Sequence, residues 1–123
     1  MDNIQELCKK ILKGDESFNN IIGSEKEKSI FCRNTNNFEL ELLPQDVINF
    51  LHLYLLHRKT EHEVKDWALF ILMSGAFSTP TPKEDCFHYD LLWTIIGELS
   101  CPEIDGELTK ERALGYIYEL KKL

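Results

Sequence analysis

Two helical patterns in the middle of the chain, separated by almost no loop, most constrain how it can fold. Pro44 suits the first turn of a helix, and the apolar residues in 47–56 recur with a period of about 3.6. Thr60 and Glu63 have the S/T-x-x-E spacing of a capping box, which predicts a second helix that ends at Gly75. Two helices joined by so short a turn pack as an αα-hairpin.

The same order of helix, break and capped helix recurs in the last part of the chain. A helix is expected over about 86–99, with Asp85 as its cap. Pro102 and Gly106 then break the chain within an acidic loop, and Thr109 is placed to cap a final amphipathic helix. We therefore expect a second αα-hairpin.

The opening third of the chain is less regular. An amphipathic helix is expected over about 3–13, with Gly14 ending it in the left-handed conformation. Short helices near 16–22 and 25–32 fit the apolar spacing less clearly. Residues 38–42 alternate as a strand would, but with no second strand to pair they are interpreted as extended chain or a lead-in to the next helix.

These patterns predict an all-α fold, a single-domain bundle of about five to six helices that contains two αα-hairpins. Residues 1–123 would form one domain, with 1–43 as the lead-in and 44–123 as the two hairpins. A chain of 123 residues with 43% hydrophobic residues can bury a real core. No apolar run is long enough to cross a membrane, so no membrane partner is expected.

Cysteine usage indicates the cellular compartment. The chain has four cysteines, no C-x-x-C pair and no basic and apolar segment of a secretory signal at its start. We expect all four cysteines to be reduced and the protein to be cytoplasmic.

Acidic charge is concentrated in the second half of the chain. The net charge is −7; residues 1–60 hold nine acids and eight bases, whereas residues 61–123 hold twelve acids and six bases. Between residues 84 and 119 there are nine acids, and the only bases are Lys110 and Arg112. A one-sided acidic field attracts a basic protein and repels nucleic acid, although solvated helix faces would give the same pattern.

Catalytic and metal-binding motifs are weak by comparison. The four histidines lack the i, i+3 or i+4 spacing of helical zinc ligands, and Cys86, His88 and Asp90 have no second pair beside them. There is no G-x-S-x-G and no phosphate-binding glycine loop. We therefore expect no catalytic residues, no metal and no cofactor, and interpret the chain as a binding protein rather than an enzyme.

One enzymatic alternative stays open. Arg58 and His62 resemble the R-x(4–6)-H motif of the helical HEPN ribonucleases, but only three residues separate them here. The surrounding acidity disfavours an RNA substrate, because phosphates are repelled by it. Trp67 and Trp93 are interpreted as core residues; as exposed aromatics among acids they would instead be anchors for a basic partner.

A family resemblance adds a function to this pattern. The helix start at 43–47, the Glu-Val-Lys-Asp-Trp-Ala segment at 63–68 and the acidic stretch at 84–111 followed by a short amphipathic helix resemble the all-helical immunity proteins of bacterial toxin systems, including contact-dependent growth inhibition and colicin-like pairs. The resemblance implies a cytoplasmic protein that binds and neutralises one cognate toxin, often a nuclease with a basic cleft.

The leading hypothesis is therefore an inhibitor that binds a basic toxin domain through an acidic surface. The alternative is a helical adaptor or self-associating regulatory module, which would use its apolar helix faces. The predicted contact residues are all acids of the second half: Asp85, Asp90, Glu98, Glu103, Asp105, Glu107 and Glu111.

Overall fold

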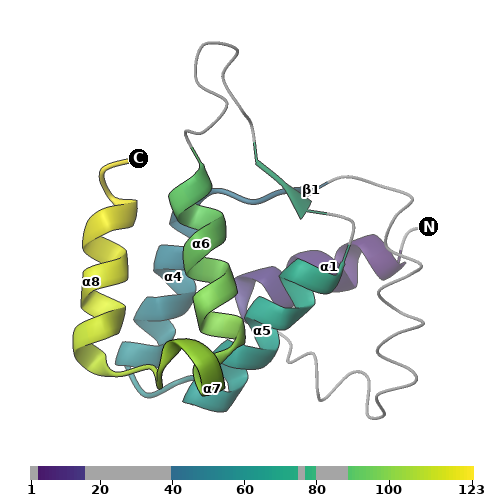
Figure 1. Ribbon diagram of the computed structural model, residues 1–123. Helices are drawn as coiled ribbons and strands as arrows, with labels where there is room; N and C mark the ends of the chain where they lie inside the picture. Colours follow the sequence, from purple (N-terminus) through teal and green to yellow (C-terminus); the bar gives the residue numbers. More distant parts are fainter. Residues whose placement is uncertain (1–2, 16–39, 75–76, 80–88) are drawn as a thin grey trace.

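The computed structural model describes residues 3–15, 40–74, 77–79 and 89–123 (Figure 1). Helices account for 71% of these residues, which confirms the all-α prediction. The elements in chain order are α1 (Asn3–Lys13), β1 (Leu40–Glu41), α4 (Pro44–Leu55), α5 (Glu61–Met73), β2 (Phe77–Ser78), α6 (Asp90–Ser100), α7 (Pro102–Asp105) and α8 (Lys110–Leu120). The short helices predicted near 16–22 and 25–32 lie outside the described residues, as does Asp85.

The largest helix contacts run between the two predicted hairpins rather than within them. α5 packs most extensively against α6, and α4 packs against α8. Figure 1 shows α6 and α8 antiparallel to each other, with α4 behind them and α1 and α5 crossing at an angle. The acidic C-terminal helices are therefore seated on the apolar α4–α5 pair.

Side chains cap the helices where the sequence predicts. The Thr60 hydroxyl accepts a hydrogen bond from the Glu63 amide at 3.1 Å, and the Glu63 carboxylate accepts one from the Thr60 amide at 2.9 Å. The Thr109 hydroxyl likewise accepts from the Arg112 amide at 3.2 Å. Each bond satisfies an amide that has no partner inside its own helix, so the starts of α5 and α8 are defined locally.

Part of the core lies where α1, α4 and α5 meet. The rings of Phe50 and Trp67 stack with their centroids 4.3 Å apart. The Trp67 indole N–H donates to the Leu12 carbonyl oxygen at 3.0 Å, so the indole is both buried and satisfied. Gly14 ends α1 at a φ of 83°, as predicted. Trp67 is thus a core residue, as expected, and Trp93 is half-buried with its N–H on the Thr79 hydroxyl.

Three sequence predictions need correction in detail. Leu40 and Glu41 do form a strand, because Phe77 and Ser78 after α5 return to pair with them in parallel. The acidic segment after Pro102 is a turn of helix, α7, rather than loop throughout. α6 begins at Asp90, about four residues later than expected, and Tyr89 is its N-cap. None of the described helices combines the length and apolar character needed to span a bilayer.

Candidate partner-binding surface

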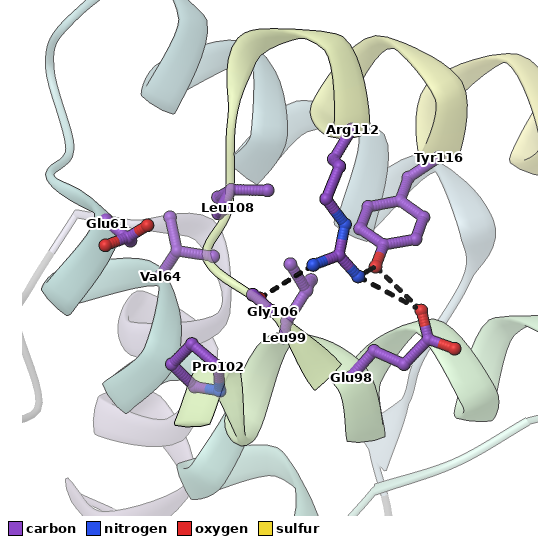
Figure 2. Close-up of a pocket in the computed structure, with 9 residues that line it drawn as sticks. All are labelled: Glu61, Val64, Glu98, Leu99, Pro102, Gly106, Leu108, Arg112 and Tyr116. Atoms are coloured by element: carbon purple, nitrogen blue, oxygen red, sulfur yellow. Dashed lines mark hydrogen bonds and ion pairs between the residues drawn. The ribbon is translucent and has the colours of Figure 1, made fainter. Parts of the chain in front are cut away.

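The connection between α6 and α8 is held in shape by one arginine. Arg112, in the first turn of α8, directs its guanidinium back over this connection (Figure 2). Its Nη1 donates to the carbonyl oxygens of Asp105 at 2.9 Å, Gly106 at 2.7 Å and Glu107 at 3.3 Å. Three successive backbone carbonyls are therefore satisfied by a single side chain, and the end of α7 is tied to α8.

The second terminal nitrogen of the guanidinium, Nη2, takes part in a polar network between α8 and α6. Arg112 Nη2 donates to the Tyr116 hydroxyl, and that hydroxyl donates to Glu98 Oε1 at 2.7 Å. Arg112 Nη2 also lies 3.5 Å from Glu98 Oε1. Burial first, and then the Glu98 carboxylate, raise the pKa of Tyr116 to about 12. The cavity beside these groups measures only about 10 Å³, which is too small for a ligand. The network therefore serves to hold α6 and α8 together.

Two of the predicted contact acids are already paired within the protein. Glu98 is bound by Arg112 and Tyr116, and Glu103 forms a hydrogen-bonded ion pair with Lys65 of α5. The Lys65 ammonium lowers the pKa of Glu103, and Glu103 in turn raises the pKa of Lys65. These two carboxylates therefore stabilise the packing of α6 and α7 more directly than they offer charge to a partner.

Four other predicted contact acids face solvent. Asp105 and Glu107 are exposed on the connection that Arg112 holds, and Glu111 is exposed just after it, in the first turn of α8. Asp90 is exposed in the first turn of α6. Within the described residues no ion pair joins any of these four carboxylates to a base. We call Asp105, Glu107 and Glu111 the acidic connection.

An apolar side chain stands among these charges, and the pattern of acids alone does not reveal it. Ile104 on α7 is 83% exposed and lies between Glu103 and Asp105 in the chain. An isoleucine this exposed gains nothing from the core, whereas a partner could bury it. Its position inside a charged run on a helical turn is the signal that could have identified it.

The residues of the alternative hypotheses lie elsewhere. His62 is exposed on α5 and its Nε2 lies 3.3 Å from Asp66 Oδ2, while Arg58 is exposed in the turn before that helix. Among the described residues no three His, Cys, Asp or Glu side chains are grouped to hold a metal ion. Cys8 and Cys101 are thiols; Cys32 and Cys86 fall outside the described part of the chain.

No family model, curated protein or solved structure matches this chain.

Proposed function

We propose that this protein is an immunity-type inhibitor, which binds a basic toxin domain through the acidic connection and Ile104. The observation that carries the proposal is the inward turn of Arg112. Arg112, which directly follows Glu111, is used on backbone carbonyls and Glu98. Within this described segment, Lys110 is then the one exposed base beside the exposed carboxylates of Asp105, Glu107 and Glu111, so the segment keeps a net negative charge toward solvent. The toxin class comes from the resemblance in helix order; the charge argues for a basic partner.

Charge and apolar contact would have separate roles in such a complex. Carboxylates on a rigid connection speed the encounter with a basic surface, and they imitate the phosphates that a nuclease cleft is built to hold. Ile104 would lengthen the lifetime of the complex, because its exposed side chain is removed from water only when the partner is bound. Binding inside the cleft of the toxin would exclude its substrate.

The test uses the product of the neighbouring open reading frame as the partner. The two proteins are co-expressed, growth is followed, and association is measured by stopped-flow at low and at high salt. The variant Asp105→Lys/Glu107→Lys/Glu111→Lys should slow association about tenfold or more at low ionic strength, with a smaller effect in high salt. Ile104→Ala should instead raise the dissociation rate and leave association nearly unchanged.

A matched control separates specific contact from net charge. Reversing Glu6, Asp15 and Glu41, which are exposed on α1, at its end and on β1, changes the total charge by the same amount. Those three reversals should leave association much closer to the wild-type rate. If the two triple variants slowed association equally, or if neither did, the acidic connection would not be the contact surface.

A further inference from the structure

An open groove lies between the antiparallel helices α6 and α8. It has a volume of about 430 Å³, and its lining includes Leu91, Thr94 and Ile95 of α6 with Gly115, Tyr116 and Tyr118 of α8. Leu91 is 36% exposed and Tyr118 is 64% exposed. Both helices are packed on their other faces against α5 and α4, so this groove is a surface that the described part of the chain leaves uncovered.

Gly115, which lines the groove, is an unusual residue for the interior of a helix. It lies inside α8, where glycine is less favourable than alanine, and its backbone is not in the left-handed region that favours glycine. A Cβ at this position would meet nothing within 4 Å, so packing inside the protein does not require the missing side chain. A glycine in such a place lets another chain approach the α8 backbone closely.

The charges around the groove select what could fill it. Glu98, Glu119 and Arg112 line it, and Glu98 and Glu119 are paired with bases of the protein. The exposed acids Asp90, one helical turn before Thr94, and Glu111, one turn before Gly115, are in no ion pair among the described residues. The bases here are engaged: Arg112 by Glu98 and three carbonyls, and Lys122 by Glu119 at 3.5 Å and by the ring of Tyr118, whose centroid lies 4.4 Å from Lys122 Nζ. A second copy of this chain, with a net charge of −7, would meet like charge at this rim.

We propose that the groove between α6 and α8 binds a basic amphipathic helix of the partner protein. Apolar side chains of that helix would enter between Leu91 and Tyr118, and its backbone would approach Gly115. Its lysines or arginines would face the exposed carboxylates of Asp90 and Glu111. This inference rests on the proposed function, since it names the element of the basic partner that is recognised.

The test uses a labelled synthetic peptide of about 18 leucine and lysine residues, with leucine at helical i, i+3, i+4 spacing. Its counterpart carries glutamate in place of every lysine. Fluorescence anisotropy should show that the lysine peptide binds the wild-type protein and that the glutamate peptide does not. Gly115→Leu should weaken binding of the lysine peptide about tenfold or more, because the new side chain occupies the groove.

Gly97 provides the matched control. It is a glycine inside α6, a Cβ added there would meet nothing within 4 Å, and it does not line the groove. Gly97→Leu should bind the peptide as the wild type does. Gly115→Ala should raise the Tm and still weaken binding, a combination that a purely structural glycine would not produce. Equal peptide affinities for Gly115→Leu, Gly97→Leu and the wild type would contradict the proposal that this groove binds the helix.

Two further outcomes keep this inference apart from the proposed function. If Gly115→Leu abolished a wild-type dimer seen by sedimentation, a second copy would be the occupant and the basic helix would be wrong. The variant Asp105→Asn/Glu107→Gln lies off the groove, so it should slow association of the natural partner and leave peptide affinity nearly unchanged. If Asp105→Asn/Glu107→Gln slows association of the natural partner but Gly115→Leu binds the peptide as the wild type does, the groove is wrong and the acidic connection stands. If Asp105→Asn/Glu107→Gln leaves that association unchanged but Gly115→Leu loses the peptide, the acidic connection is wrong and the groove stands.

Discussion

Gly106 and Arg112 each determine the geometry of the other. The Gly106 carbonyl oxygen accepts from Arg112 Nη1 at 2.7 Å, and a Cβ at Gly106 would lie 2.9 Å from that same nitrogen. The backbone of Gly106 has a φ of 102° and a ψ of 150°, a region that residues with side chains rarely adopt. The close approach of the guanidinium and the turn of the chain thus need the same glycine.

Gly106→Ala is therefore expected to lower the free energy of unfolding by about 1–3 kcal/mol, from backbone strain and from displacement of Arg112. Urea unfolding followed by circular dichroism measures the change. Gly97→Ala, a helical glycine with open space around it, should be neutral or stabilising. A loss at Gly97 as large as that at Gly106 would contradict the role given to Arg112.

Tyr116→Phe should change how stability depends on alkaline pH. The pKa of Tyr116 is raised in the folded protein from its ordinary 10.0 to about 12, so folding favours the protonated hydroxyl. Its contribution is complete below about pH 10 and is lost as pH rises from there to about 12. The variant should lose about 1–2 kcal/mol at neutral pH and show a shallower decline above pH 10. Parallel declines in both proteins would contradict this.

Lys65→Met should release the carboxyl group of Glu103. The hydrogen bond and charge of Lys65 hold the pKa of Glu103 below its usual 4.5. Glu103 therefore adds stability above that value, and the contribution is lost as pH falls through the lowered pKa. Carboxyl NMR titration should show the pKa of Glu103 rising toward 4.5 in the variant. Lys110→Met, which removes an exposed lysine outside this pair, should leave the titration unchanged.

His57→Gly should stabilise the protein. His57 follows Leu56, the C-cap of α4, with a φ of 62°, and its amide and that of Arg58 donate to the carbonyls of Tyr54 and Leu53. Histidine is strained in this left-handed position whereas glycine is not, although glycine loses more chain entropy on folding. A net gain of about 0.5–1 kcal/mol is expected. His57→Ala should give no such gain, and an equal gain from alanine would mean that strain is not the cause.

The starts of α5 and α8 were predicted well because capping side chains close in sequence determine where these helices begin. Thr60, Glu63 and Thr109 act on amides within their own first turns, so the sequence around them is enough to place α5 and α8. The buried faces of these helices were also predictable, because residues at helical spacing lie on the same side of a helix. Leu72 and Leu114, which helical spacing predicts to lie on the buried faces of α5 and α8, are instead 44% and 48% exposed.

Long-range partners could not be predicted in this way. Leu40 pairs with Phe77 across the whole α4–α5 unit, and no spacing rule connects two such distant residues. The role of Arg112 was also hidden, since a base in an acidic stretch gives no sign that it turns inward onto carbonyls. The sequence therefore shows where acids are concentrated, but only the three-dimensional structure shows that two of them, Glu98 and Glu103, are paired within the protein.

The hydrogen bond from Trp67 to Leu12 has a consequence for how far the chain could be shortened. Carbonyls in the last turn of a helix lack an intrahelical partner, and a buried indole needs an acceptor; here each supplies what the other lacks. The helix α1 is thus part of the packed core, because it supplies the hydrogen-bond acceptor of the buried Trp67 indole. A fragment lacking it would leave the indole nitrogen without its acceptor and open the stacked Phe50–Trp67 pair to water.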